Sequence, residues 1–312
     1  MTETRLSERP IAASPASPIP GTAPLPASGL VLLVLLTIFW GVNWPAMKLA
    51  LTGIAPFTFR TICLLIGGVC LLGFALAQRQ SIRIRAGDWS PLFWASLLNV
   101  TGWHLFSAYG LLQVPAGRGA IIAFTMPIWA SILASIVLKE AFTGRKIIGL
   151  LLGIGGLAVL IGPEMAALGA APIGSLLMLG AAISWASGTI VTKRQPWQLG
   201  TAALTGWQLL LGGIPILIGA LLIDPVPDFT GLSQPVLWAA IYAAVIPMIF
   251  CHWAWFRIIE LFPASIAAIG TLAIPVVGVL SSALILGEAI GPAEIAALVL
   301  VLAGLSVVLL RR

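Results

Sequence analysis

Two histidines offer the hydrogen-bonding chemistry of a binding site inside apolar segments. His104 stands in NVTGWHLFSAYG and His252 in IFCHWAWFR, each beside a tryptophan, Trp103 and Trp253. A neutral imidazole donates one hydrogen bond and accepts another, which suits a carboxylate or an amine, and it titrates near physiological pH. The alternative is a packed histidine whose ring bonds to a backbone carbonyl.

Tryptophans in the apolar segments extend this candidate site. The chain has 12 of them, and several share a segment with Asn, Ser, Thr or Tyr. Apolar walls with a few polar groups are typical of small-molecule pockets, here for a solute with an apolar or flat side chain. Alternatively, the rings only fill helix contacts. With the two histidines, the predicted substrate-binding residues are Trp40, Asn43, Trp44, Trp103, Tyr109, Trp185 and Trp253.

Acidic side chains are missing from the middle of the apolar segments. All 10 Asp and Glu residues lie in the N-terminal stretch, in loops or near segment ends. Proton-coupled carriers commonly use an intramembrane carboxylate, so we expect facilitated diffusion or exchange. The sequence also lacks an H-E-x-x-H motif and a G-x-x-x-x-G-K-[ST] loop. We therefore predict no metal site, no cofactor and no enzymatic activity.

The elements that position these residues are apolar throughout. Hydrophobic residues make up 60% of the chain and charged residues 8%, whereas soluble domains have roughly 45–50% and 25%. Crossing the ~30 Å hydrocarbon core takes about 20 apolar residues, and ten such windows lie between residues 30 and 310. The fold class is therefore an all-α membrane protein with ten transmembrane helices. We expect the proline-rich residues 1–28 to form a disordered tail.

The basic residues orient these spans. Most of the 16 Lys and Arg residues fall in alternate short loops, which are cytoplasmic if both termini are cytoplasmic. The net charge of +6 then belongs to loops beside the membrane, so no nucleic-acid partner is expected. We predict a multi-pass protein of the cell inner (cytoplasmic) membrane, with the lipid bilayer and a small-molecule solute as its partners.

The two halves of the chain repeat the same landmarks. An offset of 145 residues pairs Trp40 with Trp185 and Lys48 with Lys193, and an offset of 148 pairs Pro127 with Pro275, Glu140 with Glu288, and the two histidines. We predict two five-helix units, residues 29–165 and 170–312. Because five is odd, the units must enter the membrane from opposite sides, as inverted repeats around a central cavity.

Other residues of the repeat have predicted structural or gating roles. Lys48 and Lys193 can snorkel to the interface, and Glu140 and Glu288 can stabilise exposed helix N–H groups. Pro127, Pro247 and Pro275 lie inside spans and could bend them as gate hinges. The Gly149-x-x-x-Gly153 spacing permits a close helix approach within the fold or in a homodimer.

Several motifs resemble a known family. The stretch FWGVNWPAMK, the runs MPIWASILASIVLKE and IPVVGVLSSALILGE, and the glycine-rich span after each glutamate are similar to the drug/metabolite transporter superfamily, in its EamA-type branch, over residues 30–310. The resemblance implies a ten-helix basket whose central cavity is lined largely by the third, fourth, eighth and ninth spans, with contributions from the first and sixth. It also implies export of small organic solutes or amino acids.

These features predict a secondary transporter that works by alternating access. The predicted substrates are amino acids with hydrophobic or aromatic side chains, or related metabolites, and the protein is predicted to export or exchange them. Two alternatives stay open. One is an exporter of purines or drug-like solutes, and the other is a non-transporting membrane receptor or scaffold, which would not need an inverted repeat.

Overall fold

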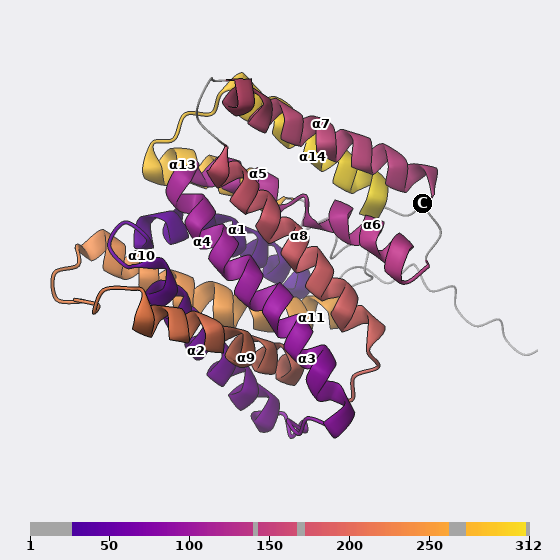
Figure 1. Cartoon of the computed structure of the whole chain (residues 1–312), viewed down its shortest axis with the longest axis vertical. Helices are drawn as coiled ribbons and strands as arrows, with labels where there is room; N and C mark the ends of the chain where they lie inside the picture. The colour runs from indigo at the N-terminus through magenta and orange to yellow at the C-terminus, as the bar shows by residue number, and fades with distance from the viewer. Residues whose placement is uncertain (1–26, 140–142, 167–171, 262–272, 310–312) are drawn as a thin grey trace, which may run out of the picture.

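The computed structural model describes residues 27–139, 143–166, 172–261 and 273–309, with their side chains except those of 161–166, 256, 259, 260, 308 and 309. Within these ranges every regular element is a helix, which confirms the all-α prediction (Figure 1). Residues 1–26 of the predicted tail lie outside the described residues. Residues 27 and 28, which the prediction placed in the tail, belong to the first helix.

The helices follow one another in two similar series. The first contains α1 (Ala27–Ala50), α2 (Pro56–Ala77), η1 (Ala86–Asp88), α3 (Trp89–Ser96), η2 (Leu97–Gly102), α4 (Trp103–Gln113), α5 (Ala116–Ala123), α6 (Met126–Val137) and α7 (Gly144–Ala166). The second contains α8 (Ile173–Arg194), α9 (Thr201–Leu222), α10 (Gln234–Val245), η3 (Ile246–Cys251), α11 (His252–Leu261), α13 (Ile274–Leu286) and α14 (Pro292–Leu309). The segment η1 is a 3-10 turn, whereas η2 and η3 are π-helical.

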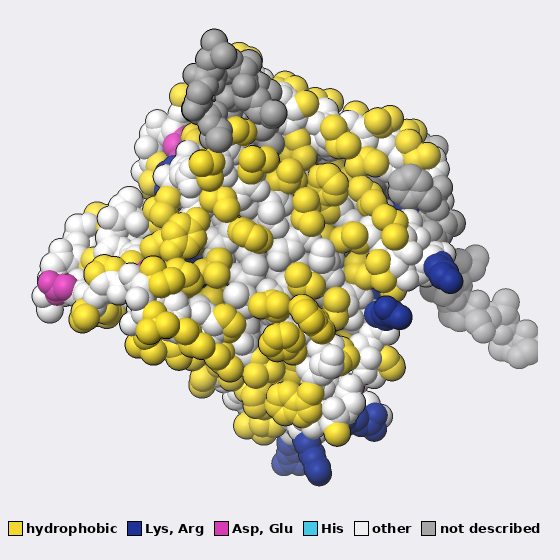
Figure 2. Space-filling view, in the orientation of Figure 1, with side chains coloured by type: hydrophobic (Ala, Val, Ile, Leu, Met, Phe, Trp, Pro, Cys, Tyr) yellow, Lys and Arg dark blue, Asp and Glu magenta, His cyan; other side chains and the backbone are white. Residues whose placement is uncertain are grey.

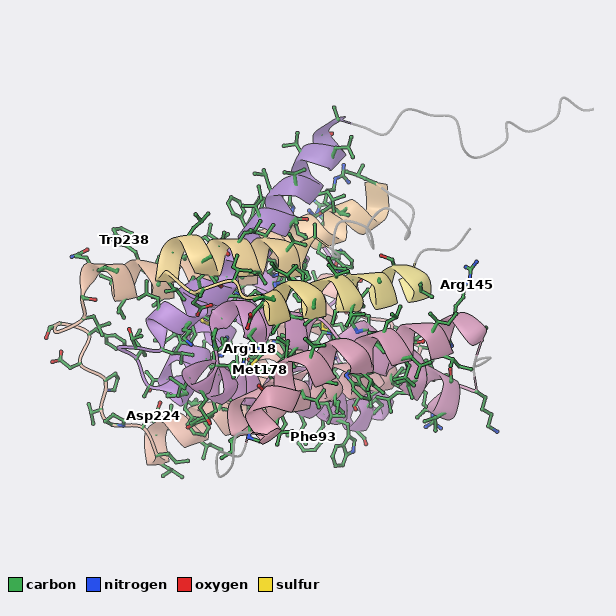
Figure 3. All side chains as sticks on the ribbon, turned by 90° about the horizontal axis from the view of Figure 1, so that it is seen from above. Phe93, Arg118, Arg145, Met178, Asp224 and Trp238 are labelled. Atoms are coloured by element: carbon green, nitrogen blue, oxygen red, sulfur yellow. The ribbon has the colours of Figure 1, made fainter. Side chains whose placement is uncertain are left out.

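Many of these helices have the dimensions of membrane spans. In the described part of the chain, six helical segments are long and apolar enough to cross a bilayer: 27–50, 56–77, 116–137, 173–194, 201–222 and 234–255. Two shorter apolar helices, Ile274–Leu286 and Pro292–Val307, accompany them. Figure 2 shows hydrophobic side chains across the visible face, with Lys and Arg gathered toward the lower and right edges. Figure 3 shows Asp224 and Trp238 at one end of the bundle and Arg145 at the other.

Glycines let the helices pack closely. The helix α7 packs along α14, and α2 along α9, as Figure 1 shows for the first pair. A Cβ atom on Gly304 of α14 would lie 2.9 Å from the carbonyl oxygen of Gly149 and 3.4 Å from the backbone nitrogen of Gly153. The predicted small-residue spacing on α7 is therefore used inside the fold.

The helix boundaries repeat along the chain. The helices α2 and α9 have 22 residues each and begin 145 residues apart. The helices α7 and α14 begin 148 residues apart, and the π-helical segments η2 and η3 begin 149 residues apart. The last offset pairs Trp103 with His252, because each begins the α-helix after its π segment. It differs by one residue from the offset that pairs the two histidines.

Candidate functional site

One aromatic group joins three helices of the bundle and the turn after a fourth. The Trp103 ring of α4 lies 6.4 Å from the Trp44 ring of α1 and 5.2 Å from the Trp185 ring of α8, measured between centroids. Trp44 also meets Phe124, which follows α5, at 6.5 Å. These separations are those of favourable edge-to-face or tilted ring pairs. Three of the predicted tryptophans therefore come together, although they lie far apart in the sequence.

A second aromatic group lies one helical turn away on α1. The Trp40 ring stands 5.9 Å from the His252 ring and 6.3 Å from the Trp255 ring of α11. The Nδ1 atom of His252 lies 2.8 Å from the carbonyl oxygen of Pro247, inside the π-helical segment η3. His252 thus makes the backbone contact that the alternative for this histidine requires. Because Trp40 and Trp44 are four residues apart, they lie on the same face of α1.

Polar side chains gather beside these rings around Met47. The amide nitrogen of Asn43 lies 3.3 Å from the Met47 sulfur, and Nη1 of Arg60 lies 3.1 Å from the same atom. Nη2 of Arg60 donates to the hydroxyl of Ser107 at 2.9 Å. The Ser107 hydroxyl donates to the carbonyl oxygen of His104 at 3.3 Å. We call Asn43, Met47, Arg60, His104 and Ser107 the Arg60 cluster.

Arg60 is the main residue that the sequence prediction missed. It lies one turn into α2, after Pro56, and only 1% of its surface is exposed. A basic residue so near the end of a span is ordinarily expected to snorkel toward the interface. One feature of the sequence could have pointed to Arg60: it lies within an otherwise apolar run, where an ionisable residue is unusual.

Two predicted binding residues lie apart from these groups. The Tyr109 ring packs against Phe57 at 5.9 Å, on the side of α4 that faces the start of α2. Trp253 is 38% exposed, and its ring packs 5.8 Å from Phe250. Among the described residues, neither ring pairs with a ring of the two tryptophan groups.

Two of the three predicted hinge prolines, Pro127 and Pro247, lie where the helix geometry changes. Pro127 stands in the first turn of α6, after the chain has left α5, and Pro275 stands in the first turn of α13. Pro247 lies within η3, where the missing N–H suits a π-helical turn. In η2, which has no proline, the Ser184 hydroxyl donates to the carbonyl oxygen of Leu98 at 2.7 Å. A turn at residues 124–125 interrupts the helix just before Pro127, whereas at Pro247 the helix continues through the π-helical segment; the residues that precede Ala273 lie outside the described part of the chain.

The Lys48 end of the bundle is held together by charged groups. The Glu288 carboxylate, just after α13, accepts the N–H of Ala116 at 2.6 Å and that of Gly117 at 3.0 Å, at the first turn of α5. Lys48 lies 3.9 Å from Glu288 and donates a hydrogen bond to the carbonyl oxygen of Val114. These contacts join α1, α5 and α13.

The structure says less about the other two predicted structural residues, Lys193 and Glu140. Lys193, at the last turn of α8, is exposed. Glu140 lies outside the described residues. The prediction placed the Glu288 carboxylate on N–H groups of the helix that follows it. In the structure it accepts N–H groups at the first turn of α5, which lies 172 residues earlier in the chain.

Comparison with known proteins identifies the family. The profile of the EamA-like transporter family matches residues 27–162 and, separately, residues 172–310. The chain belongs to this family. The resemblance of its motifs to the EamA-type branch of the drug/metabolite transporters is therefore confirmed. The EamA-like chain is a transporter and not an enzyme, and its helices make it a multi-pass membrane protein.

Similar proteins carry transporter names. An uncharacterized transporter of Bacillus subtilis, YvbV, is 30% identical over 282 residues, which are 89% of this chain and 90% of that protein. A probable amino-acid metabolite efflux pump of Escherichia coli is 23% identical over 88% of this chain and 92% of its own length. A solved crystal structure covers 90% of this chain and 96% of its own, with a TM-score of 0.63 and 21% identity, and it has the same fold.

Proposed function

We propose that this EamA-like protein exports or exchanges amino acids with hydrophobic or aromatic side chains, or related metabolites, across the cytoplasmic membrane by alternating access. The observation that carries this proposal is the ring group of Trp44, Trp103 and Trp185, with the polar Arg60 cluster beside it. Aromatic walls and a few polar groups suit a small amphipathic solute. The efflux-pump name of the Escherichia coli relative supports an amino acid as that solute.

Two five-helix units of opposite orientation underlie the mechanism. The repeated helix boundaries and the two separate family matches support units at residues 29–165 and 170–312. An odd number of spans in each unit makes the second unit enter the membrane from the other side, with both termini cytoplasmic. Lys48 then marks the outer end and Lys193 the inner end. The gathering of Lys and Arg toward the lower and right edges in Figure 2 supports this orientation.

Alternating access requires an end of the bundle that closes. In the proposed mechanism, the contacts of Lys48, Glu288 and the first turn of α5 hold α1, α5 and α13 together and keep the outer end closed. Pro127 and Pro275, at the first turns of α6 and α13, stand where these helices can tilt. The described carboxylates that bond to other groups lie near helix ends. A proton-coupled carrier would commonly use a carboxylate inside the membrane, so this placement supports exchange or facilitated diffusion instead.

Flux into liposomes tests the function. Purified protein is reconstituted, and a panel of amino acids, purines and drug-like cations is offered with and without a pH gradient. Counterflow of leucine or phenylalanine without a pH dependence supports the proposal, whereas flux of purines alone moves the assignment to the other solute class. No flux of any solute favours a receptor or scaffold. Labelling of cysteines placed at positions 48 and 193 from the same side of the membrane would contradict the inverted topology.

A further inference from the structure

Arg60 carries a buried positive charge, and its hydrogen-bond partners among the described residues are neutral. Its guanidinium bonds to a hydroxyl, that of Ser107, and to a thioether, that of Met47, at 2.9 and 3.1 Å. It also lies 5.3 Å from the centre of the Phe59 ring. A thioether sulfur is a weak acceptor, and an arginine side chain has five N–H donors. Most of the hydrogen-bonding capacity of this group is therefore unused.

The acidic side chains that the structure describes bond elsewhere. Their partners are Gln195 for Asp88, Thr58 for Asp224, Thr230 for Asp228, the first turn of α5 for Glu288, and Arg118 for Glu294. Burying a charge without a counter-ion costs several kcal/mol. An ionisable residue at such a place in a membrane protein usually has a functional reason.

Two neighbours of Arg60 in the cluster also have unsatisfied atoms. Nε of Arg60, Oδ1 of Asn43 and Nδ1 of His104 are each buried and lack a hydrogen-bond partner. More than about 90% of buried polar groups in proteins have one. The side chains of Asn43 and Arg60 belong to one group, because both contact the Met47 sulfur. Ser107 joins Arg60 to α4, where its hydroxyl also donates to the backbone carbonyl of His104. The unused hydrogen-bond donors and acceptors of Asn43, Arg60 and His104 therefore point to one ligand.

The three unsatisfied atoms differ in what they can bind. The Nε–H of Arg60 can donate to a carboxylate oxygen, and the imidazole of His104 can add a second donor. The Asn43 oxygen can accept a hydrogen bond from an ammonium group. An α-amino acid carries both groups on one carbon. Trp44 lies three residues before Met47 on the same face of α1, and both belong to one buried apolar cluster. The side chain of such a solute would therefore lie toward the Trp44 ring.

We propose that Arg60 binds the carboxylate of the transported solute, with Asn43 accepting a hydrogen bond from its amino group. This inference rests on the proposed transport function and narrows its substrate to solutes with a free carboxylate. Arg60 is covered in this conformation, so the solute reaches it when the helices part, and the carboxylate replaces the Met47 sulfur as the partner of the guanidinium. A neutral amide of the same solute cannot supply the negative charge that would pair with the guanidinium of Arg60.

The test compares an amino acid with its amide. Full-length protein in liposomes is assayed with L-phenylalanine and L-phenylalaninamide, which differ only at the carboxylate. The wild type should prefer the acid by at least about tenfold in kcat/KM, because a site built for a polar group rejects an analogue that lacks it. Arg60→Gln should remove this preference by slowing the acid while leaving the amide within about twofold, and Arg60→Lys should keep part of it.

A matched arginine controls for loss of charge. Arg118→Gln removes the pairing of Arg118 with Glu294, 2.8 Å apart, on a neighbouring helix, and it should leave the preference for the acid unchanged. Equal losses for acid and amide in Arg60→Gln would show a structural role and overturn the inference, with transport intact. If Arg60→Gln does not fold, the wild-type comparison still tests the inference, because equal transport of the acid and the amide by the wild type overturns it. Flux of neither compound nor of any solute in the panel would contradict the transport function itself.

Discussion

Replacement of Glu288 by glutamine should open the Lys48 end of the protein. The carboxylate accepts two N–H groups at the first turn of α5, at 2.6 and 3.0 Å, and lies 3.9 Å from the Lys48 ammonium. Glutamine has a similar size, but it has one acceptor oxygen and no charge. The variant therefore weakens the junction of α1, α5 and α13 without creating a cavity.

The size of the effect follows from the bonds that are lost. Hydrogen bonds to charged groups contribute about 1.5–3 kcal/mol each, and glutamine keeps part of one of the two. Loss of about 1.5–3 kcal/mol from the closed state changes the ratio of open to closed protein roughly 10- to 100-fold, since 1.4 kcal/mol corresponds to a factor of ten. Such a change is large enough to see in the labelling of a site behind the junction.

A single cysteine at position 279 reports this opening. Val279 is 5% exposed, and its Cα lies 3.2 Å from the place that a Cβ on Gly117 would occupy, so it is covered by α5. Cys63, Cys70 and Cys251 are replaced first. A membrane-impermeant maleimide added on the Lys48 side should then label Glu288→Gln about 10- to 100-fold faster than the parent.

The control keeps the change of charge but moves it to another contact. Glu294→Gln removes the pair of Glu294 with Arg118 at the same end, which ties α14 to α5 and leaves α13 in place. Its labelling rate should stay close to that of the parent. If Glu288→Gln labels no faster than the parent, or if both variants label equally fast, the Glu288 contacts do not hold this end closed.

Three further variants test other contacts. Gly304→Ala should lower the free energy of unfolding in detergent by about 1–3 kcal/mol, because the new Cβ meets a backbone carbonyl of α7 at 2.9 Å. Gly155→Ala is the control: the atom nearest to its new Cβ is 3.9 Å away, so the melting temperature should not change. Trp103→Ala should raise the KM for phenylalanine about 2- to 10-fold through loss of ring contacts, and the more exposed Trp253→Ala should not. Pro275→Ala should slow flux several-fold at unchanged membrane expression, and an unaltered rate would remove its role as a hinge.

Part of the candidate site was predictable because its chemistry is local. Tryptophans inside apolar runs are visible in the sequence, and Trp44, Trp103 and Trp185 do meet. The partners of each ring were not predictable. In a helix that is apolar on all sides, the pattern of residues does not say which face turns to the protein and which to lipid, since both environments accept the same side chains. Trp253 and Tyr109 therefore were predicted from residue type alone, and in the structure their rings pair with Phe250 and Phe57 instead of the tryptophan groups.

The sequence by itself determined the helical class of the chain and the offsets at which its landmarks recur. Lipid requires the backbone of a long apolar run to bond within its own helix, so composition alone is enough to predict all-helical structure. The offsets of 145 and 148 residues likewise recur in the helix boundaries.

Only the tertiary structure decided which side chains share a site. The π-helical segments η2 and η3 each shift the following helix face, and η2 depends on contacts from α8, such as that of Ser184 with Leu98. The bond of Glu288 to α5 and the neutral partners of Arg60 likewise join residues that are distant in the chain. Close packing at glycines, rather than amphipathic pattern, sets how helices rotate against one another in a membrane, and that rotation places these groups.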